Sequence, residues 1–119
     1  QEVNIRECYE TLGSNYDEVL RRFCGSEDTV KRFALKFLDD GTYDELCSAM
    51  EESDGERAFR AAHTLKGVAA SLGFDDLTTT ASVLAEKLRP QTGFPDDEYF
   101  SAVGREYDRV IAAAGQLED

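Results

Sequence analysis

Apolar residues recur three and four positions apart along most of the chain, which is the period of an amphipathic helix. One clear example is the stripe formed by Val30, Phe33, Ala34, Phe37 and Leu38. No stretch shows the alternation of polar and apolar residues that is typical of a half-buried strand. The pattern therefore predicts an all-α protein.

Start and stop signals for helices divide this pattern into segments with short connections. Two capping boxes, Thr42 with Glu45 and Ser53 with Glu56, each predict the start of a helix. Gly73 is predicted to end the helix that contains the middle of the chain. The expected helices span residues 3–12, 16–24, 27–40, 42–50, 54–72, 75–89 and 96–114.

Short connections favour antiparallel neighbours, so the expected architecture is an antiparallel up-down four-helix bundle with additional N-terminal helices. We expect a single domain over residues 1–119. Its bundle core is predicted at about residues 42–115, with residues 1–41 forming N-terminal capping helices.

The charge balance limits the kinds of partner. Lysine and arginine total 13 against 25 aspartates and glutamates, which gives a formal net charge of −12. An acidic surface repels phosphate backbones and anionic lipid, so no nucleic acid and no membrane is expected as a partner. No apolar run has the length of a membrane span, and no secretory signal pattern is present. We expect a cytoplasmic protein.

The cysteines and the single histidine argue against a metal site. Cys8, Cys24 and Cys47 are far apart and do not form a CxxC motif, and one histidine cannot complete a ligand set with them. We therefore expect no metal, and we expect the three cysteines to be buried or half-buried thiols in a reducing compartment.

Helical phase predicts that His63, the only histidine, faces solvent. Each residue turns a helix by about 100°, so His63 points roughly 160° away from Leu65. A continuous apolar face surrounds the direction of Leu65, formed by Ala58, Ala61, Ala62, Val68, Ala69 and Leu72. A buried structural role for His63 is therefore not favoured.

The residues on the same helix face as His63 are compatible either with a reactive site at the imidazole or with an ordinary exposed surface without a function. Gly67 lies mid-helix, where glycine costs about 1 kcal/mol relative to alanine, and it would leave a clearing beside the imidazole. A neutral imidazole is a good nucleophile, and an ammonium one turn away, at Lys66, could stabilise a phosphoryl group on it. Arg60 is a second candidate for that role. Phe59 and Ala70 are candidates for a docking face, although Phe59 is large enough to fold back into the edge of the core.

The sequence Ala62-His63-x-Leu65-Lys66-Gly67, followed by Leu72-Gly73, resembles the signature of histidine-containing phosphotransfer (HPt) domains of two-component phosphorelays. The resemblance implies reversible phosphoryl transfer between His63 and an aspartate of a receiver domain. By position it makes His63 the phosphoacceptor, gives Lys66 a contact with the phosphoryl group and makes Gly67 the point of access. The role of Arg60 is an inference from its place on the helix.

The residue after His63 argues against autonomous kinase activity. Kinase dimerisation domains usually place an acidic residue there, whereas this chain has Thr64 and no glycine-rich nucleotide loop. We expect no cofactor in this chain, with Mg²⁺ held by the partner receiver domain. The expected partners are response-regulator receiver domains, with a hybrid histidine kinase as a further candidate, and the domain is expected to be a monomer. The main alternative is a non-phosphorylated helical interaction module of the same fold; a metal-dependent or hydrolytic enzyme ranks far lower.

Overall fold

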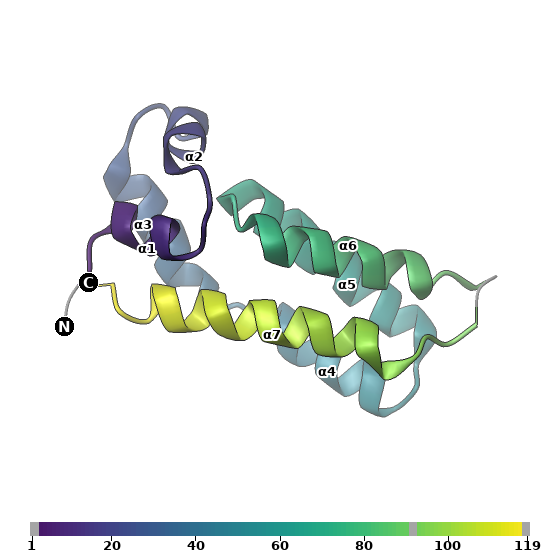
Figure 1. Ribbon diagram of the computed structural model, residues 1–119. Coiled ribbons are helices and arrows are strands. Elements are labelled where there is room, and N and C mark those ends of the chain that lie inside the picture. Colours follow the sequence, from purple (N-terminus) through teal and green to yellow (C-terminus); the bar gives the residue numbers. More distant parts are fainter. Residues whose placement is uncertain (1–2, 91–92, 118–119) are drawn as a thin grey trace.

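The computed structural model describes residues 3–90 and 93–117, and this part of the chain forms seven α-helices (Figure 1). The only β-type pairing in it is an isolated bridge between Val3 and Leu117. The helices are α1 (Ile5–Thr11), α2 (Tyr16–Arg22), α3 (Glu27–Phe37), α4 (Thr42–Glu51), α5 (Gly55–Leu72), α6 (Asp75–Lys87) and α7 (Asp97–Ala114). The predicted all-α class is confirmed.

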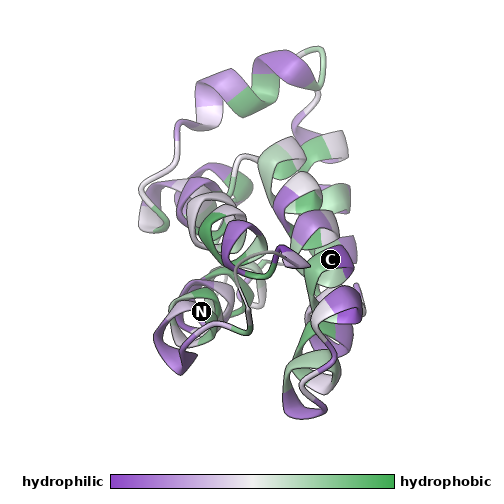
Figure 2. Cartoon of the chain, turned by 90° about the vertical axis from the view of Figure 1, so that its right-hand side faces the viewer, coloured by the Kyte–Doolittle hydropathy of each residue, from purple (hydrophilic) through white to green (hydrophobic). Residues whose placement is uncertain are grey.

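Helices α4 to α7 form the bundle, and each runs antiparallel to the one before it (Figure 1). Helix α5 packs against both α4 and α6, and α6 packs against α7. Hydrophobic and hydrophilic residues lie on different sides of the helices (Figure 2), as expected when one face of each helix covers a core. The predicted antiparallel bundle is therefore present, and α5 is its central helix.

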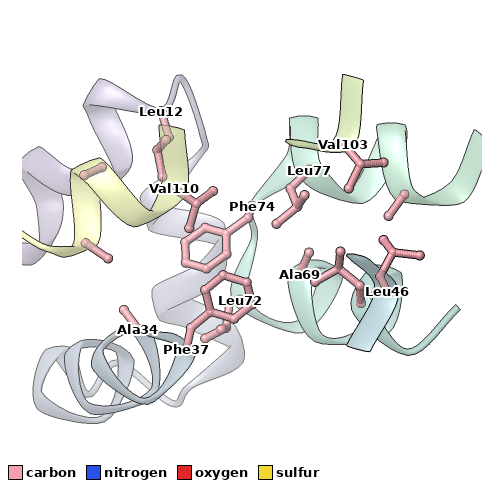
Figure 3. Packing of buried hydrophobic residues seen from close by; sticks show 14 of the residues in the cluster. Leu12, Ala34, Phe37, Leu46, Ala69, Leu72, Phe74, Leu77, Val103 and Val110 are labelled. Carbon is pink, nitrogen blue, oxygen red and sulfur yellow. The ribbon is translucent and has the colours of Figure 1, made fainter. Parts of the chain in front are cut away.

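Helices α1 to α3 pack on the end of the bundle where α5 turns into α6 (Figure 1). The buried Tyr9 of α1 donates a hydrogen bond from its hydroxyl to the carbonyl oxygen of Leu72, the last residue of α5. Phe37 of α3 lies against Phe74 with ring centroids 5.4 Å apart, and Figure 3 shows this pair at the junction. The bundle core therefore continues into the N-terminal helices.

Both predicted capping boxes are wrong. Thr42 is the first residue of α4, and its N–H donates a hydrogen bond of 2.8 Å to the side-chain carboxylate of Asp40. Ser53 has a φ of 52° and ends α4, with its N–H bonded to the Met50 carbonyl. Since Ser53 is used to terminate one helix, the next residue, Asp54, caps α5 instead.

The three cysteines, Cys8, Cys24 and Cys47, are free thiols. Cys8 is buried and Cys47 is half-buried, as predicted, but the prediction is wrong for Cys24, which is exposed because it lies in the turn after α2 with a φ of 57°. No helix in the described residues is both long and apolar enough to cross a membrane.

Candidate functional site

Helix α5 carries the candidate site, and local signals define both of its ends. At the start, the Asp54 side chain accepts the N–H of Arg57, which satisfies one of the free donors of the first turn. At the end, Gly73 has a left-handed φ of 75°. A Cβ on Gly73 would also lie 2.2 Å from Cγ2 of Val19, so only glycine allows α2 to approach this closely. The 18 residues between these ends form one uninterrupted helix.

The helix turns its apolar face to the core and His63 to solvent. Its buried residues are Ala58, Ala61, Ala62, Leu65, Ala69 and Leu72. His63 is exposed, as helical phase predicts, and it lies near the middle of the helix. The small side chains of the buried face allow close approach of the neighbouring helices, which fixes α5 and therefore the position of the imidazole.

Phe59 contacts His63 directly. The two rings are stacked, with centroids 6.0 Å apart and an angle of 18° between their planes. Phe59 is half-buried and also packs against the hydrophobic core. Phe59 is therefore both a residue at the edge of the core and a neighbour of the imidazole at the surface.

Glu86, in the last turn of α6, and Arg89, which follows α6, complete this side of the site. Neither residue was identified from the sequence. The guanidinium of Arg89 lies over the Phe59 ring, 5.3 Å from its centroid. Arg89 also donates two hydrogen bonds of 3.0 Å to the Glu86 carboxylate. The i, i+3 spacing of Glu86 and Arg89 predicts an ion pair between them. Only the packing of α6 on α5 places Arg89 beside Phe59.

Lys66 lies on the same side of His63 as α6. The pKa of the Glu86 carboxyl is held below its ordinary value, chiefly because Arg89 donates to it, with a smaller contribution from the positive charge of Lys66. Lys66 is half-buried, so its aliphatic stem lies on the protein while its ammonium remains near the surface. The site thus places a cation one turn from the imidazole.

Arg60 lies on the other side of the same face. It forms an exposed ion pair with Glu56 at 3.1 Å, one turn earlier on α5. Exposed pairs of this kind contribute little free energy, so Arg60 can exchange this partner for another anion at small cost. A role in stabilising a phosphoryl group stays a prediction.

Gly67 and Ala70 leave the surface beyond His63 open. A Cβ built on Gly67 would meet no heavy atom within 4 Å. Ala70 is exposed, and its carbonyl oxygen accepts a hydrogen bond of 2.8 Å from Arg22 of α2. The N-terminal helices therefore add a cation at the end of this face, a contact that depends on folding and that the sequence pattern does not reveal.

The charged groups near His63 include carboxylates as well as cations. Arg60 is paired with Glu56, and Arg89, which lies over the Phe59 ring, is paired with Glu86. The net charge of the whole chain is −12. Across residues 3–90 and 93–117, no group of three or more His, Cys, Asp or Glu side chains could hold a metal ion.

Comparison with known families identifies the class of protein to which this site belongs. The family model of the Hpt domain matches residues 38–119, and the chain therefore belongs to the Hpt domain family. Membership makes it a phosphotransfer module and implies an interaction with the receiver domains of two-component systems. Helices α1 to α3 lie before the matched residues. No curated protein and no solved structure matches the chain significantly.

Proposed function

We propose that this module accepts a phosphoryl group on His63 from the aspartyl phosphate of one receiver domain and passes it to another. The observation that carries the proposal is the exposed imidazole in the middle of a rigid helix, one turn before a glycine whose Cβ position is open. A second protein can therefore bring a bulky phosphorylated side chain close to the ring.

The transfer itself needs little from this chain beyond a positioned nucleophile. The lone pair of a ring nitrogen attacks phosphorus, a P–N bond forms and the P–O bond to the aspartate breaks, so the carboxylate leaves. The proton on the other ring nitrogen is released to solvent from the phosphorylated ring. In the second transfer the other ring nitrogen takes a proton back from solvent, an aspartate carboxylate of the next receiver attacks phosphorus, the P–N bond breaks and neutral imidazole leaves.

The residues around His63 would take separate roles in this step. Lys66 would stabilise the phosphoryl oxygens by a charge-assisted hydrogen bond, with Arg60 as a second cation on the opposite side. Gly67 gives access, and Phe59 and Ala70 form part of the docking face. Mg²⁺ would be bound by the receiver domain, and this chain would need no cofactor of its own.

Several wider features of the proposal follow from the sequence. Thr64 after His63 is not an acid that could assist attack on ATP, so we expect no autonomous kinase activity. The acidic chain is expected to act as a cytoplasmic monomer without nucleic acid or membrane partners, receiving phosphoryl groups from receiver domains that include those of hybrid kinases. A non-phosphorylated interaction module is not favoured, because His63, Lys66 and Gly67 of the signature are all present.

The experiment is incubation with a panel of phosphorylated receiver domains, comparing the wild type with His63→Gln. The wild type should acquire a phosphoryl group that is labile in acid and stable in base, as expected of a phosphoramidate. His63→Gln should remain unlabelled and keep its melting temperature, because the side chain faces solvent. Equal labelling of the folded variant would contradict the proposal.

A further inference from the structure

A hollow of about 450 Å³ opens between the start of α5 and the end of α6. Its apolar lining includes Phe59, Leu88, Pro90 and Phe94, and the charged residues that line it are Glu56 and Arg89. Phe94 follows α6 in the connection to α7 and is 46% exposed. A large aromatic side chain left in water beside an apolar hollow is a feature of surfaces that another molecule covers.

The hollow adjoins the phosphoacceptor. Phe59 connects the two, because it lines the hollow and its ring also stacks on His63. Arg89 likewise lines the hollow and lies over the same ring. Any side chain that enters the hollow therefore contacts residues next to the imidazole.

The distances agree with a single interface that covers both. Glu56 precedes His63 by seven residues, which is roughly 10 Å along the helix. A small, transient interface buries about 600 Å² on each partner, equivalent to a disc of roughly 14 Å radius. A receiver centred on His63 would therefore reach Glu56 and Phe59, which form the α5 side of the hollow.

We propose that this hollow is the specificity pocket of the module, and that it takes one large aliphatic or aromatic side chain of the receiver domain docked on His63. The inference rests on the proposed function. Apolar anchors in pockets commonly supply most of the energy of an interface, while the polar edge supplies orientation. Here Glu56 and Arg89 would form such an edge around the apolar lining.

The position of the hollow separates recognition from chemistry. In the proposed function, phosphoryl transfer takes place at His63, whereas Phe94 lines the hollow and does not belong to the proposed reacting groups. A receiver that lacks the anchoring side chain would bind more weakly but react in the same geometry once bound. The pocket should therefore change the receiver concentration needed for transfer and leave the rate at saturation unchanged.

Two substitutions test the pocket from opposite directions. Phe94→Ala removes part of its wall, and Phe33→Ala is the matched control, because Phe33 is 41% exposed on α3 and does not line the hollow. Gly55→Leu adds bulk, since Gly55 lines the hollow and a Cβ there meets no heavy atom within 4 Å. Gly55→Ala is its control, with a similar gain in helix propensity but little bulk.

The measurement is the single-turnover rate of transfer from a phosphorylated receiver that labels the wild type, as a function of receiver concentration. Phe94→Ala and Gly55→Leu should each raise the half-saturating concentration about tenfold. The saturating rate should stay close to that of the wild type in both variants, and both controls should transfer as the wild type does. The melting temperature of Phe94→Ala should match that of Phe33→Ala, and the melting temperature of Gly55→Leu should match that of Gly55→Ala.

The possible contrary results are distinguishable. If the wild type is labelled but Phe94→Ala matches Phe33→Ala, the pocket proposal is wrong and the proposed function stands. A loss confined to the saturating rate would also overturn it, because the residues would then act on the chemistry. If no receiver labels the folded wild type, the proposed function fails and the pocket proposal fails with it.

Discussion

Replacing Gly67 with leucine should make the protein more stable and much less active, an unusual combination that follows from the geometry of α5. Gly67 lies five residues before the end of an 18-residue helix, so it is an interior position. Glycine there costs about 0.8–1.0 kcal/mol relative to alanine, and leucine is close to alanine. A Cβ at Gly67 would meet no heavy atom within 4 Å apart from its own helix backbone, so the first atom of a side chain causes no clash that would offset this gain.

The expected gain in the free energy of unfolding is therefore about 0.7 kcal/mol, equivalent to a rise in melting temperature of roughly 2–4 °C for a chain of this size. The expected loss of transfer is larger. Residues one turn apart on a helix have Cβ atoms about 5–6 Å apart, so the leucine side chain would lie beside His63 in the path of the receiver. A displacement of about 1 Å in a reacting group can reduce a rate about 100-fold.

The assay combines thermal unfolding, followed by circular dichroism, with the rate of transfer from a phosphorylated receiver. Gly67→Ala serves as the control, since it supplies nearly all of the gain in helix propensity with little added bulk. It should be at least as stable as Gly67→Leu and transfer faster. A lower melting temperature for Gly67→Leu would mean that the glycine is required for packing. Unchanged transfer would mean that the receiver docks elsewhere.

Three further substitutions or conditions give separate tests. Lys66→Ala should slow transfer and shorten the lifetime of the phosphohistidine, because a charge-assisted contact is lost; unchanged kinetics would exclude Lys66 from the site. Phe59→Ala should reduce stability by about 1–2 kcal/mol, since the ring is only half-buried, and should weaken receiver binding by more; a large loss of stability with unchanged affinity would make Phe59 a core residue. Burial raises the pKa of the Cys8 thiol from 9.0 to about 11, so the folded state holds this proton more tightly than the unfolded state. Stability should be complete below pH 9 and fall between pH 9 and 11, by up to about 1.4 kcal/mol per pH unit for this group, and urea unfolding should show a shallower fall in Cys8→Ala.

Helical phase was sufficient to predict the orientation of α5. The period of its apolar residues places His63 opposite Leu65, and Gly73 supplies the left-handed residue that ends the helix. Both signals are local, because they depend on residues within a few turns of one another. This explains why the bundle and the exposed histidine could be predicted from the sequence.

Capping was harder to predict because neighbouring polar residues compete for the same position. Ser53 and Asp54 can each cap a helix, and the way in which α4 ends decides between them. Asn4 and Asn15 cap α1 and α2 by accepting backbone N–H groups, and Asn4 forms a capping box with Glu7, so the same kind of signal was correct there and wrong at Thr42 and Ser53. The ends of helices are therefore less certain than their faces.

The contacts around the site that come from other helices could not be predicted at all. Arg89 reaches Phe59 only because α6 returns alongside α5, and Arg22 reaches Ala70 only because α2 packs on Gly73. Such contacts depend on tertiary packing, about which spacing along a single helix carries no information. The specificity pocket belongs to this group, since α5, α6 and the segment that follows α6 all contribute to it.

The most direct test of the account is to locate the phosphoryl group on the wild-type protein after incubation with a phosphorylated receiver domain. Phosphorus NMR combined with mass spectrometry under neutral conditions should find a single phosphoramidate on the imidazole of His63. Addition of an unphosphorylated receiver should then remove it and phosphorylate an aspartate of that receiver. A phosphoryl group on any other residue, or one on His63 that no receiver can remove, would contradict the account.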